Sequence, residues 1–330
     1  MQWQILSGVR FVLALLVVCD HLPMFMPMTQ PWITFQKLGG FPAVVGFLVI
    51  SGYSIAHSIT KNPDGFYWRR FIRIYPLYAL AVLLATIPFL FTSPVIVTLT
   101  ESGRFIQPDF YAILGNLLLL QGLVTDPLSS NTVVWTLSIE ITCYLLAPLF
   151  IRLSNRSLLI LIGISSLFFI SYPYYVLLIT KDPFYFHYSY RKFALGLIAL
   201  FWAWLLGFFY YRTSDQEASK IFLIVLGCAL LNYNQIAVPK WGILVYILTS
   251  LILVYASQIK ISKLSAKILS FLGDISYPLY LFHLPIMLLC YAAFGIRGWF
   301  GLLLPAFLGS IFFYYLVDVP LRVKKKVKLA

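Results

Sequence analysis

Charged residues are scarce in this 330-residue chain. Only 11% of the positions are Asp, Glu, Lys or Arg, whereas 61% are hydrophobic and 18% are aromatic. A soluble domain has a charged share of about 25%, so the composition excludes a soluble globular protein and is typical of a polytopic membrane protein. We therefore expect an all-α bundle of transmembrane helices, forming one membrane-embedded domain over residues 1–330 with no appended soluble domain.

Cysteine is also rare, and its placement excludes two kinds of site. The four cysteines are Cys19, Cys143, Cys228 and Cys290, each in an apolar segment and without a CxxC spacing. This pattern predicts neither a disulfide framework nor a metal site. We also expect no cleavable signal peptide, because the first apolar segment contains polar residues and lacks a small-residue cleavage site.

Long apolar runs are frequent. A helix needs about 20 residues to cross a bilayer, and ten segments approach or exceed that length. They lie near residues 5–26, 39–60, 71–93, 133–151, 157–179, 191–211, 219–237, 241–257, 267–291 and 298–318. An eleventh apolar segment, 110–123, is shorter and contains Asn116 and Gln121. It is either a further crossing or a re-entrant or interfacial piece.

The distribution of Lys and Arg decides between these topologies, because cytoplasmic loops carry an excess of cations. If 110–123 does not cross and the N-terminus is cytoplasmic, sixteen cations fall inside and seven outside. If it does cross, the count becomes nine inside and fourteen outside. We therefore predict about ten crossings of the cytoplasmic (inner) membrane with both termini in the cytoplasm. The net charge of +13 is then mostly an orientation signal, so membrane lipid is an expected partner and nucleic acid is not.

The first apolar segment carries the clearest sign of function. Arg10 and His21 are eleven residues apart, which on an α-helix brings them within about 20° of one face and about 16 Å apart along the axis. An unpaired charge in hydrocarbon costs at least about 2.5 kcal/mol, so we expect this stripe to face a polar cavity. Asp20 points about 100° away from His21 on the same helix.

Two more titratable residues fall in the predicted outer leaflet with His21. Glu140 and His283 both lie in the outer halves of their helices in the ten-crossing topology. A carboxylate inside a helix is costly unless it is paired, so Glu140 is either paired with an arginine or catalytic. His283 is either a packing residue or part of the same site.

A cluster of cations lies on the opposite, cytoplasmic side. Arg69, Arg70 and Arg73 open the helix predicted near 71–93. Arginine binds phosphate in a bidentate manner, so these side chains could hold the phosphates of a cofactor. They could equally anchor the helix on lipid phosphates, and the sequence leaves both interpretations open.

Six short motifs now occur in the order seen in the acyltransferase 3 family. They are Arg10-x10-His21, Val49-Ile-Ser-Gly-Tyr53, Arg69-Arg-x-x-Arg73-Ile-Tyr-Pro76, Trp135-Thr-Leu-Ser-Ile-Glu140-x-x-x-Tyr144, Gly273-Asp-Ile-Ser-Tyr-Pro-Leu-Tyr-Leu-Phe-His283-Leu-Pro285 and Val317-Asp-Val-Pro320. The chain resembles this family of integral membrane acyltransferases over nearly its whole length. It departs from the family in Asp318, where Glu is common, and in Asp20, where a neutral residue is more usual.

The resemblance implies a membrane-bound O-acyltransferase. Such an enzyme would move an acyl group, with acetyl the first expectation, from cytoplasmic acyl-CoA (acetyl-CoA) to a hydroxyl of an exported or envelope carbohydrate. By the same resemblance, His21 corresponds to the family's essential histidine, and Arg10, Arg70 and Arg73 to its functional arginines.

The chemistry of acyl transfer gives the individual roles. The reaction needs a base for the acceptor hydroxyl and an anchor for the anionic donor, and histidine titrates near neutral pH. His21 could act as a general base or accept the acyl group as a covalent relay. We predict catalytic roles for His21 and Glu140, and contacts to acyl-CoA for Arg10, Arg69, Arg70 and Arg73. The residues predicted to bind substrate or support the site are Ser51, Tyr53, Trp135, Tyr144, Tyr277 and His283.

Two other functions fit part of the pattern. A proton-coupled exporter of a carbohydrate or another small solute could use His21, Glu140 and His283 as a proton relay, although no inverted repeat of broken helices is evident. A non-catalytic membrane subunit of a polysaccharide assembly system is the second alternative. Transfer or hydrolysis of acyl-CoA by the purified protein would separate an enzyme from both.

Overall fold

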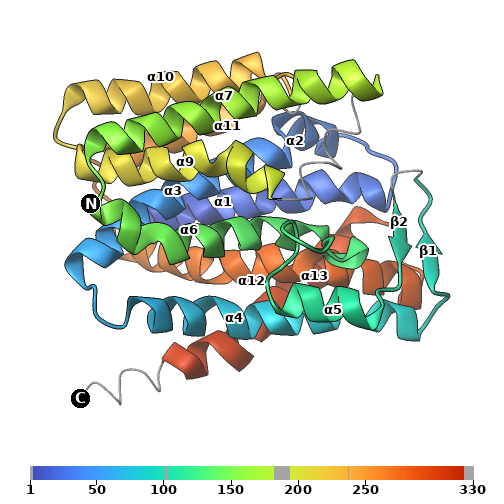
Figure 1. The fold of residues 1–330 in the computed structure, drawn as a ribbon. Helices are drawn as coiled ribbons and strands as arrows, with labels where there is room; N and C mark the ends of the chain where they lie inside the picture. Colours follow the sequence, from blue (N-terminus) through green and yellow to red (C-terminus); the bar gives the residue numbers. More distant parts are fainter. Residues whose placement is uncertain (1–2, 101–102, 182–193, 237, 323–330) are drawn as a thin grey trace.

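The computed structural model describes residues 3–100, 103–181, 194–236 and 238–322. Within these residues, ten main helices lie side by side and run back and forth along one axis (Figure 1). They are α1 (Trp3–His21), α3 (Gly40–Lys61), α4 (Phe66–Leu84), α6 (Trp135–Arg152), α7 (Asn155–Thr180), α9 (Leu195–Arg212), α10 (Glu217–Tyr233), α11 (Gly242–Tyr255), α12 (Lys263–Phe294) and α13 (Trp299–Phe313). Each of these ten helices overlaps one of the ten predicted segments.

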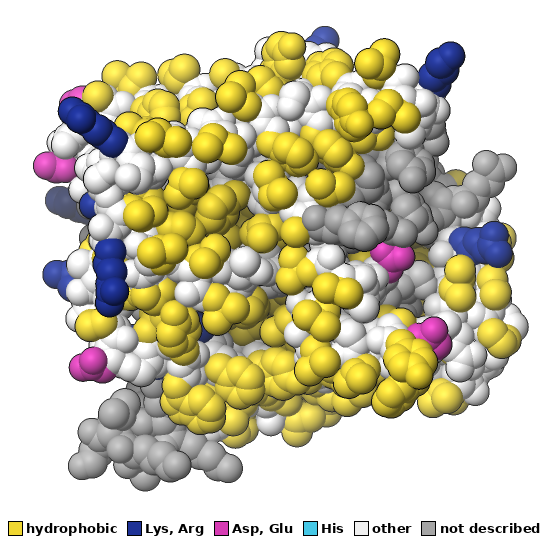
Figure 2. Space-filling view, viewed as in Figure 1, with side chains coloured by type: hydrophobic (Ala, Val, Ile, Leu, Met, Phe, Trp, Pro, Cys, Tyr) yellow, Lys and Arg dark blue, Asp and Glu magenta, His cyan; other side chains and the backbone are white. Residues whose placement is uncertain are grey.

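The all-α polytopic bundle is confirmed. Eight of the helices are long and apolar enough to cross a membrane, whereas α10 with 17 residues and α11 with 14 are shorter. Figure 2 shows hydrophobic side chains over much of the middle of one face, with Lys and Arg gathered toward both ends of the bundle. On α7 alone, Ile160, Leu167 and Leu178 are each more than 60% exposed. Such a surface is unfavourable in water and favourable in lipid, so the chain is an integral membrane protein.

The bundle has two distinct ends. At the near end, on the left of Figure 1, α1, α4 and α12 begin and α3 ends, and residue Arg322 also lies there. At the far end, on the right, α1 ends near the short α2 (Trp32–Leu38). The far end also carries two antiparallel strands, β1 (Val95–Val97) and β2 (Arg104–Ile106), which pair Val95 with Ile106.

The segment 110–123 does not cross the bundle. Its helix α5 (Phe110–Leu117) has eight residues and is about 12 Å long, which is too short to span a bilayer. The side chain of Ser129 exchanges hydrogen bonds with the backbone of Ile106, so the chain returns to the end from which it entered. The side chain of Asn116, one of the two polar residues noted in this segment, donates a hydrogen bond to the backbone carbonyl of Asp126. The interfacial or re-entrant alternative is therefore the correct one.

Small residues allow the central helices to approach closely. A side chain at Gly52 of α3 would lie 1.9 Å from the carbonyl oxygen of Trp204, and one at Gly207 of α9 would lie 2.0 Å from that of Val49. Helices in lipid gain stability from such backbone contact. Helix α1 packs lengthwise against α12. This contact places Arg10 and His21 next to the motif that contains His283.

Candidate active site

A cavity of about 340 Å³, lined by both charged and apolar side chains, opens at the near end between α1, α3, α4, α6 and α12. The stripe on α1 faces it only in part, because Arg10 lines the cavity and His21 does not. The cavity also contains Glu140 from α6 and two of the predicted arginines, Arg70 and Arg73, from α4. The prediction that the whole stripe faces one polar cavity is therefore correct for Arg10 and wrong for His21, which belongs to a separate site.

Two arginines of the cavity donate hydrogen bonds to serines on one face of α3. Arg10 donates a 2.6 Å hydrogen bond to Ser54 Oγ, and Arg70 donates one of 2.6 Å to Ser58 Oγ. The guanidinium of Arg70 also lies over the ring of Tyr144, 6.0 Å from its centre. Its Nε is buried and has no hydrogen-bond partner among the described residues. A buried charged donor without a partner is unfavourable, and an anionic ligand would satisfy it.

Glu140 is held by hydroxyl groups. Its carboxylate accepts a 2.9 Å hydrogen bond from Ser51 and a second one from Tyr144. It also interacts electrostatically with Arg10 and Arg70. One carboxylate among the cavity's three arginines on α1 and α4 leaves this part of the cavity positively charged, which suits a phosphate-bearing ligand.

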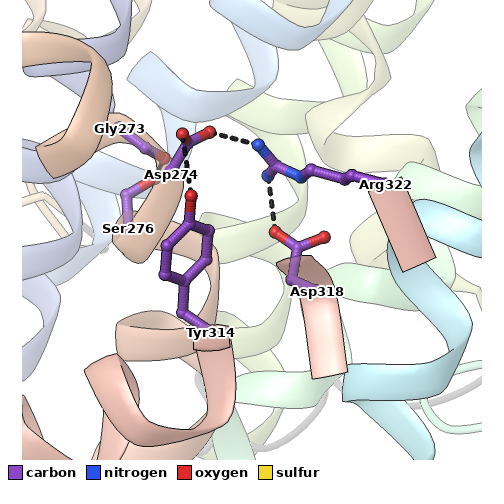
Figure 3. A network of polar contacts seen from close by, with 6 residues as sticks. All are labelled: Gly273, Asp274, Ser276, Tyr314, Asp318 and Arg322. Atoms are coloured by element: carbon purple, nitrogen blue, oxygen red, sulfur yellow. Dashed lines mark hydrogen bonds and ion pairs between the residues drawn. The ribbon is translucent and has the colours of Figure 1, made fainter. Parts of the chain in front are cut away.

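Three residues of the cavity lining, Asp274, Asp318 and Arg322, form a cluster of ion pairs, shown in Figure 3. Arg322 binds Asp274 of α12 at 2.6 Å and Asp318 at 2.5 Å, and the Tyr314 hydroxyl donates to Asp274 at 3.2 Å. Residues Tyr314–Asp318 form a π-helical turn directly after α13. Such turns are frequent at functional sites, and this one brings Asp318 and Arg322 into the cavity lining beside Asp274.

The histidine pair lies farther along the bundle. His21 and His283 have ring centres 5.2 Å apart, with Nε2 of His283 3.4 Å from Nδ1 of His21. His283 is fully buried, whereas His21 is half-buried. Glu140 lies in the cavity with Ser51 and Tyr144, so the structure joins two of the three predicted titratable groups and places the third elsewhere.

Hydrogen bonds to the backbone assign the protons of the pair. Nδ1 of His283 is 3.0 Å from the carbonyl oxygens of Leu279 and Tyr280. Because a carbonyl oxygen only accepts, this Nδ1 carries a proton and Nε2 has the lone pair of the neutral ring. Nδ1 of His21 likewise donates to the Val17 carbonyl at 2.7 Å, so the lone pair of neutral His21 is on Nε2. That atom is the proton acceptor that acyl transfer to a hydroxyl needs.

The end of α1 supports this role. His21 is the last residue of α1, and Pro23 follows in a short 3-10 turn. Helix carbonyls stabilise positive charge at this end, which favours a histidine that becomes protonated. Asp20 instead accepts a hydrogen bond from the backbone N–H of Gly40, at the start of α3. Asp20 also interacts electrostatically with His21, so the expectation that Asp20 faces away from His21 is not confirmed.

The remaining predicted residues divide between the cavity and its surroundings. Tyr277 lines the cavity together with Ser51 and Tyr144 and donates to the Ile74 carbonyl at 3.0 Å. Tyr53 packs outside it, between Trp3 and the tyrosines at 210 and 211. Trp135 begins α6 and is not in the lining. Arg69 binds backbone carbonyls of the loop between α3 and α4, so the structure brings Arg70 and Arg73 to the cavity but not Arg69.

Several lining residues were not singled out from the sequence. His57 lines the cavity, and its ring lies 4.9 Å from that of Trp3. Arg322 is one of the sixteen cations assigned to the inner side, and its i,i+4 spacing from Asp318 is an ion-pair signal. Asp274 lies in the motif that begins at Gly273, but the motif gave no indication that this carboxylate pairs with Arg322.

Comparison with known proteins identifies the family to which the chain belongs. The family model described as an acyltransferase domain matches residues 3–319, and the chain belongs to this family. The chain is 27% identical over 256 residues to a candidate acetyltransferase of Acidianus two-tailed virus, covering 74% of this chain and 72% of the relative. It is 30% identical over 166 residues to the acyltransferase MdmB of Streptomyces mycarofaciens, covering 46% of this chain and 40% of the relative. No solved structure matches.

Proposed function

We propose that this membrane acyltransferase moves an acyl group, acetyl in the first place, from acyl-CoA to a hydroxyl of an exported or envelope carbohydrate. The donor enters the cavity at the near end, and the acceptor reaches His21 from the far end. The family membership supports acyl transfer. We infer the donor from the charge of the cavity and the carbohydrate acceptor from the family resemblance.

The observation that carries the choice of donor is the unsatisfied positive charge in the cavity. Arg10, Arg70 and Arg73 line it together, and Nε of Arg70 is buried without a partner among the described residues. Coenzyme A bears phosphates that guanidinium groups bind well. Its pantetheine arm is long and flexible enough to extend from the arginines toward the histidine pair.

The histidine pair would perform the transfer. Nε2 of His21 takes the proton of the acceptor hydroxyl while the oxygen attacks the thioester carbonyl. The carbon–sulfur bond then breaks, and the thiolate of coenzyme A leaves and takes that proton from His21. His283 keeps the His21 ring in the required tautomer, since its Nε2 lies 3.4 Å from the protonated Nδ1 of His21. Transfer through an acyl-His21 intermediate uses the same Nε2 as the nucleophile.

We propose a supporting role for Glu140 rather than the role of the base. It binds Ser51 and Tyr144 and offsets part of the arginine charge. The cavity could then release coenzyme A after transfer, because a site with three uncompensated arginines would bind the product too tightly.

We further propose that the near end faces the cytoplasm, which is where acyl-CoA is found, so that both termini are cytoplasmic and the membrane is the inner one. Lys61 and Arg152 are the last residues of α3 and α6, and Lys260 precedes α12, so all three lie toward this end and are among the sixteen cations counted as inner. Under the positive-inside rule this is the orientation that the sequence favours.

The exporter alternative finds less support. A proton relay needs donors and acceptors in hydrogen-bond reach of one another. His21 and His283 meet this condition, whereas Glu140 belongs to the hydroxyl network of Ser51 and Tyr144.

The test is incubation of membranes that contain the protein with radiolabelled acetyl-CoA, followed by fractionation of the labelled products. We expect label in a glycan or lipid-linked glycan fraction, and none in matched membranes with the His21→Ala variant. Equal labelling in the two membranes would contradict the proposal.

A further inference from the structure

The near-end cavity stops short of the histidine pair. Its lining reaches farthest toward the far end at Val44 and Phe47 of α3, Thr136 of α6 and Tyr280 of α12, and it includes neither histidine. The rings of Phe47 and Tyr280 meet edge to face with centres 5.8 Å apart. This aromatic pair therefore forms part of the inner wall of the cavity.

Tyr280 is the side chain that separates the two sites. One side of it lines the cavity, and its ring centre is 6.5 Å from that of His283. Its hydroxyl donates to the Val133 carbonyl at 3.0 Å and is 2.7 Å from Thr136 Oγ1. Because polar contacts at its tip hold this ring, Tyr280 is the fixed half of the wall.

Phe47 is the half that can move. Its ring has no polar atom to anchor it, and the side chain is half-buried because it borders the cavity. A rotamer change of a phenylalanine at a cavity wall opens space at a modest cost, whereas a shift of Tyr280 would break hydrogen bonds. The thioester carbonyl of a donor in the cavity has to pass this point to meet an acceptor at His21.

We propose that Phe47 and Tyr280 form a gate between the donor cavity and the histidine pair, and that Phe47 limits the length of the acyl chain that can be transferred. The inference rests on the proposed function, since it takes acyl-CoA as the occupant of the cavity. The acyl group is the leading end of the pantetheine arm, so it passes between the two rings first. A short acyl group passes, and a longer one meets the Phe47 ring.

The test measures kcat/KM with acetyl-CoA, butyryl-CoA and hexanoyl-CoA for the full-length protein and for Phe47→Ala. A methylene group that has to be accommodated in an apolar site changes kcat/KM by about tenfold or more. We expect the ratio of butyryl to acetyl transfer to rise at least about tenfold in Phe47→Ala, and to rise less in Phe47→Leu. The reverse change, Phe47→Trp, should lower the ratio.

The matched control is Phe41→Ala on the same helix. Phe41 stacks on Phe169 with ring centres 6.3 Å apart and does not line the cavity, so its removal should leave the ratio of butyryl to acetyl transfer unchanged. A ratio equal to that of the parent protein in the Phe47 variants that still transfer acetyl would overturn the gate. If the parent protein transfers no acyl group from any acyl-CoA, the proposed function itself fails, and the two failures are thereby distinguished.

Discussion

At the scale of single residues, neighbouring arginines have different surroundings. Arg70 points into the cavity toward Ser58 and Tyr144, whereas Arg69 turns back to carbonyl groups of the preceding loop. The sequence placed both among the donor-binding residues, because a run of arginines does not show which side chains a helix directs inward. The packing of α4 against α12 decides this, and that contact cannot be read from a local motif.

The different surroundings of Arg70 and Arg69 lead to a prediction in which the Arg69 variant is the control for the Arg70 variant. Arg70→Ala should weaken acyl-CoA binding by about tenfold to a hundredfold, since a lost hydrogen bond to a charged group costs about 1.5–3 kcal/mol. Arg69→Ala removes the same side chain one position away and should leave binding unchanged. Titration calorimetry of the two purified variants provides the measurement. Unchanged binding in both variants would assign the cluster to lipid anchoring instead, and equal losses in both would contradict the difference between Arg69 and Arg70.

At the scale of helices and their contacts, the positions of the elements were predictable. Apolar runs and their breaks located the ten main helices, since a bilayer admits few other backbone structures. The ends were less predictable: α4 begins at Phe66, five residues before the expected 71, because its first turns carry charge and face the near end. The partner of each helix was not predictable, so the meeting of His21 with His283 and the separation of Glu140 required the structure.

The contact between α3 and α9 gives a prediction for stability. Gly52→Ala would place a methyl group 1.9 Å from a backbone oxygen of α9, which neither helix can avoid without moving. Overpacking of this kind costs about 1–3 kcal/mol. The control is Gly163→Ala on α7, where nothing lies within 4 Å of the added carbon. Thermal unfolding in detergent should show a lower Tm for Gly52→Ala than for Gly163→Ala, and equal values would contradict the close approach.

At the scale of the whole molecule, the structure is asymmetric along the membrane normal. The near end has the arginine cavity and the ion pairs of Arg322, whereas the far end has the two strands, α2 and the half-buried His21. This division suits a reaction whose donor and acceptor arrive from opposite sides. The sequence anticipated it through the cation count and the Arg10 to His21 spacing, but gave no sign of the wall between the two sites.

Orientation and topology can be tested together by cysteine labelling in intact cells. In a background with Cys228→Ala, Ser93→Cys and Asp126→Cys should both react with an impermeant reagent. Ser93 lies just before β1 at the far end, and Asp126 lies between α5 and Ser129, which bonds to Ile106 of β2 at the same end. Gln216→Cys, in the near-end loop between α9 and α10, should react only after the cells are opened. Labelling of Ser93→Cys and Asp126→Cys from opposite sides would contradict the fold of α5 described above.

The most direct test of the central claim is a comparison of acetyl transfer and acetyl-CoA binding in the purified parent protein and His21→Gln. Glutamine has a similar reach but does not take a proton at neutral pH, so the rate of transfer should fall by at least about a hundredfold. Binding of acetyl-CoA should be unchanged, since His21 does not line the donor cavity. Near-normal transfer by a correctly inserted His21→Gln variant would show that His21 is not the base and would contradict the account.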